Sequence, residues 1–181
     1  MPGVSSPSPR GPVGRALDVL YDVSAALAAL AMVVLLAMVL LSIVSRQVGF
    51  NVPGVDAYAG YMMAGAGFLA LAHTLKRGEH IRVTLLLSAL HGGARRAFEI
   101  WALAAAALLA ALFAGYSCKL AWQSYTFHDI STSNDATPLW LPELAMAIGS
   151  VVFAIAFIDE LVLEIQGRRF VPVSDEAARN E

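Results

Sequence analysis

Charged residues are scarce in this sequence. Only 14% of its 181 residues are Asp, Glu, Lys or Arg, whereas about a quarter are charged in a typical soluble domain. In contrast, 58% are hydrophobic, and they are gathered into long runs. This composition argues against a soluble protein and indicates an integral membrane protein. The formal net charge of −2 decides nothing about nucleic acid, but the sequence has no long basic block that could follow a phosphate backbone.

Cysteine and histidine are rare as well. The single cysteine, Cys118, excludes an intrachain disulfide and a thiolate metal cluster, and we interpret it as a small packing residue. Of the four histidines, only His73 lies inside a hydrophobic run. The sequence contains no Walker loop, no nucleophile–base pair and no cluster of metal ligands. We therefore expect no catalytic residue, no cofactor and no metal ion.

Four hydrophobic runs are long enough to cross a membrane, which takes roughly 20 apolar residues. The predicted spans are about 24–44, 57–75, 100–118 and 139–162. The expected fold is all-α, with one four-helix membrane domain over 18–166, because helices satisfy their own backbone hydrogen bonds in lipid. Residues 1–17 are rich in Pro, Ser and Gly and are predicted to form a disordered tail, and residues 167–181 a second tail.

Basic residues between the runs predict the orientation of the chain, because Lys and Arg concentrate on the cytoplasmic side. They are frequent in both tails and in the middle loop, and rare in the first and third loops. The basic positions of the three rich regions are Arg10, Arg15, Lys76, Arg77, Arg82, Arg95, Arg96, Arg168, Arg169 and Arg179. We expect both termini and the middle loop in the cytoplasm.

The middle loop, which begins with LKRGEH, is predicted to contain a short amphipathic helix over residues 80–91. Its polar stripe is His80, Thr84, Ser88 and His91, and its apolar stripe is Val83, Leu86, Leu87 and Leu90. The segment is too short to span, so it would lie on the membrane surface with Lys76, Arg77 and Arg82 near anionic head groups. The alternative is an irregular loop whose charges only set the topology. Charge counting assigns no role to Glu79 or His80.

Small residues form a stripe on the second predicted span. Gly60, Ala64 and Gly67 recur at i, i+4 and i+7, a spacing that allows close helix packing in lipid, within the chain or against a partner. Gly65, Gly67 and Ala70 also match a nucleotide-binding fingerprint, but that motif needs a preceding strand. We therefore interpret the stripe as a packing surface.

Three charged residues near the predicted outer ends of the spans are further candidates for partner contacts. Arg46 and Asp56 flank the first loop and are placed to pair across it. Such a pair contributes little stability where it is exposed. Glu143 follows Pro142 at the start of the fourth span, where a carboxylate suits the positive end of the helix dipole.

Several segments together resemble the small membrane subunit of tripartite ATP-independent periplasmic (TRAP) transporters, the DctQ-like family. They are SRQV (45–48), Asp56, Gly67 followed by LKRGEHIRV (75–83), TSNDATPLWLPE (132–143) and Gly149. The stretch PGVDAY departs from the family pattern, which often has an aromatic residue and two adjacent acids there. The order of the segments, with four helices, carries the resemblance over most of the chain.

The resemblance implies a non-catalytic subunit of the bacterial inner membrane. Such a subunit would scaffold a large multi-span membrane subunit, which takes up organic acids delivered by a periplasmic substrate-binding protein and is driven by an ion gradient, usually sodium. Two alternatives stay open. One is a stand-alone membrane scaffold or assembly factor, and the other is a four-helix anchor that binds haem, which would need facing histidine pairs.

Overall fold

The structure is a computed structural model that describes residues 12–50, 52–77, 93–133 and 135–167. Its elements are α1 (Pro12–Val48), α2 (Val55–Lys76), α4 (Gly93–Phe127) and α5 (Trp140–Ile165). Each of these helices is long and apolar enough to cross a membrane. This confirms the expected all-helical fold with four spanning helices for the described part of the chain. The predicted surface helix at 80–91 lies outside it, as do Glu79, His80 and Arg82.

The helices are longer than the hydrophobic runs that predicted them. α1 begins at Pro12, so residues 12–17, predicted to belong to a disordered tail, are helical. Proline suits the first turn of a helix because its missing N–H would have no partner there. Leu17 then packs against a buried cluster that includes Tyr21, and this contact stabilises the additional helical turns. α4 likewise continues to Phe127, beyond the predicted end near residue 118.

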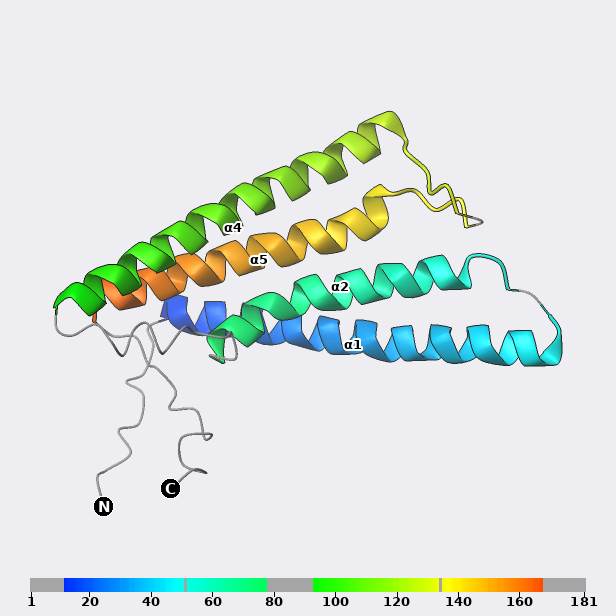
Figure 1. Cartoon of the computed structure of the whole chain (residues 1–181), viewed down its shortest axis with the longest axis horizontal. Coiled ribbons are helices and arrows are strands. Elements are labelled where there is room, and N and C mark those ends of the chain that lie inside the picture. Colours follow the sequence, from blue (N-terminus) through cyan, green and yellow to red (C-terminus); the bar gives the residue numbers. More distant parts are fainter. Residues whose placement is uncertain (1–11, 51, 78–92, 134, 168–181) are drawn as a thin grey trace, which may run out of the picture.

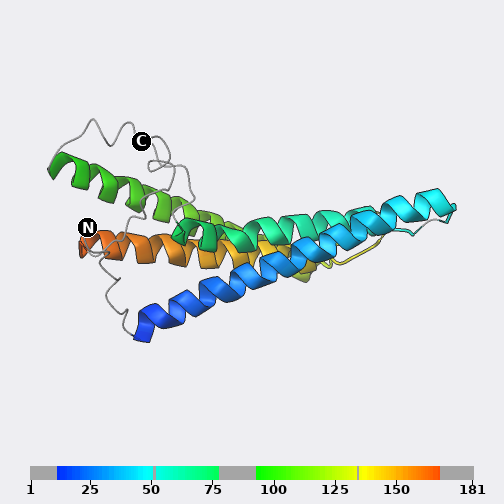
Figure 2. The ribbon, with the colours of Figure 1, turned by 90° about the horizontal axis from the view of Figure 1, so that it is seen from below.

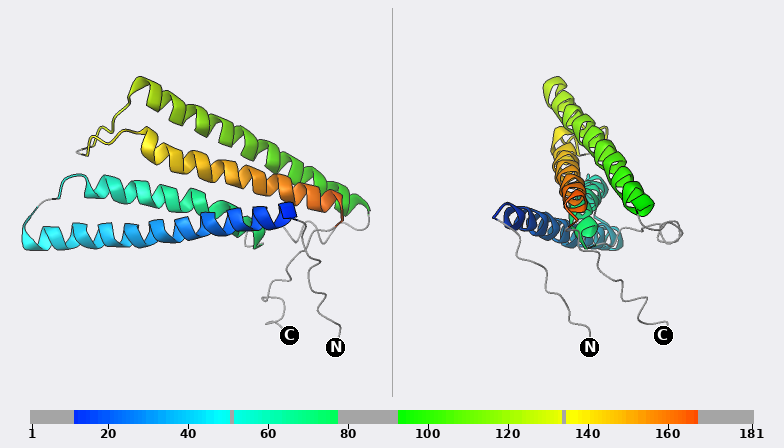
Figure 3. Two further views of the ribbon diagram at one scale, coloured as in Figure 1. Left: turned by 180° about the vertical axis from the view of Figure 1, so that it is seen from behind. Right: turned by 90° about the vertical axis from the view of Figure 1, so that its left-hand side faces the viewer.

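The four helices stand side by side in the order α4–α5–α2–α1 (Figure 1). α4 packs on α5, α5 on α2 and α2 on α1, so the helices form an open layer rather than a closed bundle. Viewed from below, α1 and α4 incline in opposite directions (Figure 2), and the end-on view shows the resulting twist (Figure 3). The arrangement leaves broad apolar surface uncovered, especially on α1, where Leu30, Val33 and Leu36 are exposed.

Both outer helices bury a heptad stripe. On α4 the buried positions are separated alternately by four and three residues: Leu103, Ala107, Ala110, Ala114, Ser117, Ala121 and Ser124. On α1 the buried residues Tyr21, Ser24 and Ala28 belong to a stripe of the same kind, and Ser24 Oγ donates to the carbonyl of Leu69 on α2 at 2.6 Å. Heptad spacing suits helices that run nearly antiparallel, and small side chains let their backbones approach closely in lipid.

Two exposed tryptophans on α4 are spaced as the two interfaces of a membrane would be. Trp101 and Trp122 are 65% and 70% exposed, and the helix rises about 31 Å between them. This rise matches the roughly 30 Å thickness of the hydrocarbon core, and tryptophan is enriched at both of its interfaces. The Trp101 end is also the end at which α2 finishes with Lys76. We call it the Lys76 end, and we call the opposite end the Trp122 end.

Candidate functional site

The two helical hairpins, α1–α2 and α4–α5, meet mainly where α2 packs on α5. We call this contact the α2–α5 seam. Three groups of residues hold it, one at each end and one in the middle. The seam decides how the two hairpins are placed, and with it the shape that the whole layer presents to a partner.

A buried ion cluster holds the seam at the Lys76 end. The Lys76 ammonium contacts the Asp159 carboxylate and lies 3.0 Å from Glu160 Oε1. The three side chains are only 11%, 15% and 9% exposed. The ring of Tyr21 lies beside the same ammonium, which is 5.3 Å from the ring centroid. Because buried charges are costly unless paired, this cluster fixes α1, α2 and α5 to one another.

Sequence analysis singled out only one of the three charged residues of this cluster, Lys76. Lys76, predicted to lie among lipid head groups, is instead mostly buried between two carboxylates. Asp159 and Glu160 were not predicted as site residues, although both lie inside the predicted fourth span, 139–162. The available signal was that adjacent acids should reach the same membrane level as Lys76. Arg77, the neighbouring predicted head-group residue, is exposed.

A glycine brings the two backbones together in the middle of the seam. A Cβ atom at Gly149 would lie 2.6 Å from the backbone carbon and oxygen of Phe68, closer than van der Waals contact allows. A Cβ atom at Gly65 would lie 3.5 Å from the Ala145 side chain, an ordinary van der Waals distance. The ring of Phe68 then stacks on Phe113 of α4, with centroids 5.8 Å apart. Gly149 therefore sets the distance between α2 and α5.

The predicted small-residue stripe is not part of this seam. Gly60, Ala64 and Gly67 are exposed, and a Cβ atom at Gly60 or Gly67 would meet nothing within 4 Å in the described part of the chain. The seam uses the neighbouring face of α2, which includes Gly65. Close packing of the stripe within the subunit is therefore not seen, and its contact with a partner stays a prediction.

The loop between α4 and α5 docks onto α2 at the Trp122 end. Tyr61 donates its phenolic hydrogen to Asp135 Oδ2 at 3.0 Å, and Thr137 Oγ1 lies 3.1 Å from the Tyr58 hydroxyl. Gly54 has a φ of 81°, a left-handed conformation that glycine adopts without strain. A Cβ atom there would lie only 2.7 Å from the Cβ of Asp135. This end of the seam therefore depends on both polar bonds and a close approach.

Asp135 is held as a carboxylate by its hydrogen bonds. The bond with Thr137, followed by those with Ser131 and Tyr61, lowers the pKa of Asp135 to about 2 and outweighs the opposing effect of desolvation. Hydrogen bonds to the charged form of a carboxyl group have this effect because they are lost when it is protonated. The loop contact is therefore charge-assisted at any pH well above 2.

The predicted pair at the tip of the α1–α2 hairpin is confirmed. Arg46 Nη2 lies 3.2 Å from Asp56 Oδ2, with side chains 74% and 73% exposed. Ser42 Oγ donates to the other carboxylate oxygen of Asp56 at 2.9 Å. A pair this exposed adds little to stability. Both charges remain accessible to anything that approaches this end of the molecule.

Two further sequence predictions have different outcomes. Glu143 lies in the first turn of α5, where it was expected, and no side chain caps the helix at Leu139. The Glu143 Oε2 atom is buried without a hydrogen-bond partner among the described residues, so its predicted partner contact stays a prediction. The packing role predicted for Cys118 is wrong, because this side chain is exposed on α4, next to the buried stripe position Ser117.

These features define a class of protein: a multi-span helical membrane subunit whose two hairpins are locked together and whose outer faces stay open. Comparison with protein families identifies the particular family. Residues 35–167 match the family described as tripartite ATP-independent periplasmic transporters, DctQ component. The chain therefore belongs to the DctQ family of TRAP transporter components. A search of curated proteins gives no match. In general, DctQ proteins function with a large TRAP membrane subunit and a periplasmic binding protein.

Proposed function

We propose that this protein is the small permease subunit of a TRAP transporter, and that it acts as a rigid scaffold for the large membrane subunit. The open layer is the observation that carries this proposal. Its helices leave large apolar faces uncovered, and extensive exposed apolar surface marks membrane or protein contacts. The seam would keep that surface in one shape while a neighbouring subunit moves.

The finer parts of the proposal come from the family resemblance. The partner subunit would take up organic acids delivered by a periplasmic binding protein, driven by an ion gradient, with sodium as the expected ion. The protein would lie in the bacterial inner membrane, with both termini in the cytoplasm. The Lys76 end would then face the cytoplasm, and the Arg46–Asp56 tip would face the periplasm, where a soluble partner could contact it.

Co-purification and uptake test this proposal together. The tagged full-length chain should retain the large TRAP subunit from the same organism, and deleting its gene should abolish uptake of a labelled organic acid. A wild-type copy should restore both. If the chain never associates with that subunit and its deletion leaves uptake intact, the proposal is wrong.

The same experiment separates the alternatives. A stand-alone scaffold or assembly factor would purify with other proteins and leave uptake unchanged. A haem anchor would carry a Soret absorption band. Within the described spans, the only histidine is His73, and its Nδ1 atom lies 3.6 Å from Asp22 Oδ1, which gives this side chain a partner within the protein.

A further inference from the structure

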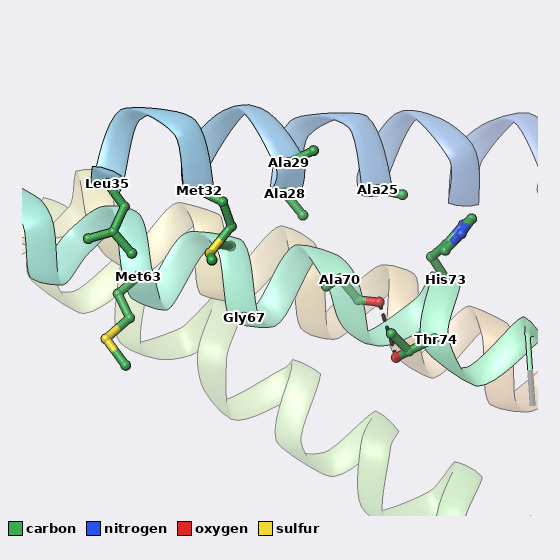
Figure 4. A pocket seen from close by; sticks show the side chains of 11 residues that line it. Ala25, Ala28, Ala29, Met32, Leu35, Met63, Gly67, Ala70, His73 and Thr74 are labelled. Atoms are coloured by element: carbon green, nitrogen blue, oxygen red, sulfur yellow. Dashed lines mark hydrogen bonds between the residues drawn. The ribbon is translucent and has the colours of Figure 1, made fainter. Parts of the chain in front are cut away.

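An apolar groove runs between α1 and α2 on the outside of the layer. Its volume is about 600 Å³, within the range of small-molecule binding pockets. Small residues form its floor: Ala25, Ala28, Ala29, Ala66, Gly67 and Ala70. Figure 4 shows Leu35, Met32 and Met63 at one end of the groove and His73 and Thr74 at the other. The groove therefore has one wholly apolar end and one polar end.

The groove is about half as long as the hydrocarbon core of a membrane is thick. On α2 its lining runs from Met63 to Thr74, about 16 Å along the axis, and on α1 from Ala25 to Leu35, about 15 Å. These lengths equal half of the roughly 30 Å hydrocarbon core. The polar end lies next to Lys76, at the boundary, and the apolar end lies near the membrane centre. A spanning partner helix would need a groove of twice this length.

Charge at the mouth of the groove complements a phospholipid head group. Arg77 follows Ala70, His73 and Thr74 at i+7, i+4 and i+3, so it shares their face of α2 and lies just beyond the groove. It is exposed, and no ion pair of Arg77 is found among the described residues. Arginine binds phosphate well because its planar fork donates two hydrogen bonds. Asp22, on the α1 side, is 76% exposed beside His73.

We propose that this groove binds one acyl chain of a phospholipid from the leaflet at the Lys76 end, with the lipid phosphate beside Arg77. The apolar lining, the half-membrane length and the exposed Arg77 beyond the polar end each match one part of such a molecule. Asp22 favours a head group that also carries an ammonium. The inference rests on the proposed function only for naming this leaflet as the cytoplasmic one.

Filling the groove tests the proposal. Gly67→Leu adds a side chain to the floor, and nothing within 4 Å of its Cβ position opposes it. Gly60→Leu is the matched control, because Gly60 is equally open on the same helix but does not line the groove. Full-length variants are reconstituted in vesicles of phosphatidylethanolamine and phosphatidylglycerol, extracted in mild detergent and examined by native mass spectrometry.

Wild type and Gly60→Leu should each retain one phospholipid, and Gly67→Leu should retain it about tenfold less. Arg77→Gln should also lower retention, because it removes the cation that would lie beside the lipid phosphate. Circular dichroism checks that each variant is helical. Ala29→Leu, on the α1 side of the groove, provides a second test, and Ala26→Leu, which is exposed and does not line the groove, is its control.

Equal retention in wild type, Gly67→Leu and Ala29→Leu overturns the proposal. A wild type that retains no lipid also overturns it, and if both groove variants then lose the large subunit, the groove holds a partner's side chains instead. Loss of lipid with normal association of the two subunits supports lipid binding. The proposed scaffold function is tested separately, and it fails if the wild-type chain does not co-purify with the large subunit.

Discussion

At the scale of single residues, Gly149 has the least room for a side chain among the described glycines. In Gly149→Ala the new Cβ would lie 2.6 Å from the backbone of Phe68, and a backbone atom cannot rotate away. Overpacking of this kind costs about 1–3 kcal/mol. We expect a lower thermal midpoint for Gly149→Ala in detergent, measured by circular dichroism.

The control for Gly149→Ala is Gly60→Ala. A Cβ atom at Gly60 meets nothing within 4 Å, and alanine is the better helix former by about 1 kcal/mol. Gly60→Ala should therefore melt at or slightly above the wild-type temperature. An unchanged midpoint for Gly149→Ala would show that the backbones at the seam are farther apart than described.

Asp135 predicts an acid-sensitive loop. Because its folded-state pKa, about 2, lies below the ordinary value of 3.8, its stabilising effect is fully present above about pH 5. The effect is lost as the pH falls through the folded-state pKa. Hydrogen exchange of residues 128–133 should be faster in Asp135→Asn than in wild type at neutral pH, and the difference should shrink between about pH 4 and 2. A constant difference over that range would contradict the assigned pKa.

The Arg46–Asp56 pair predicts an effect on assembly rather than on folding. Both side chains are about three-quarters exposed, so charge reversal at either should change stability by no more than about 1 kcal/mol. We expect Arg46→Glu or Asp56→Lys to insert normally and to lower the yield of the complex with the large subunit or the binding protein. Unchanged complex yield and unchanged uptake would remove this pair from the interface.

At the scale of whole helices, the ion cluster predicts a strongly asymmetric response. Lys76→Met leaves two carboxylates buried without their lysine, and breaking a buried pair costs about 3–5 kcal/mol. The triple variant Lys76→Met, Asp159→Asn, Glu160→Gln removes the charges together and should recover part of that loss. Thermal unfolding of the three proteins in detergent measures the order. A triple variant less stable than Lys76→Met would show that the carboxylates have a more important second role.

The helices also show which local patterns the sequence could reveal. Spans are set by the length of apolar runs, because backbone groups in lipid must be satisfied within a helix, and all four were predicted. The predicted ends agree with those of α2 and α5 to within three residues. The start of α1 was missed, because Pro12 begins that helix and packing of Leu17 extends it, neither of which hydropathy measures. The Arg46–Asp56 pair was predictable since a short loop brings its two residues together.

At the scale of the whole molecule, the membrane orientation is the main open prediction. Ser133 lies in the loop at the Trp122 end and Gln166 follows α5 at the Lys76 end, and both are exposed. In a Cys118→Ser background, Ser133→Cys should react with an impermeant maleimide in cells whose outer membrane has been made permeable. Gln166→Cys should react only after lysis. The reverse labelling pattern would invert the topology.

The amino-acid sequence by itself determined that this protein lies in a membrane, how many helices span it, and which family pattern it carries. Those properties depend on composition, run length and short motifs, which are local. Only the tertiary structure decided the order α4–α5–α2–α1 and the residues of the seam. Lys76 and its two carboxylates are 83 and 84 positions apart in the sequence. The contact of Gly149 with Phe68 involves the backbone of Phe68, so the type of side chain at position 68 does not reveal it. Hydropathy reports how deep a residue lies in the membrane, but the direction it faces depends on which helices pack together.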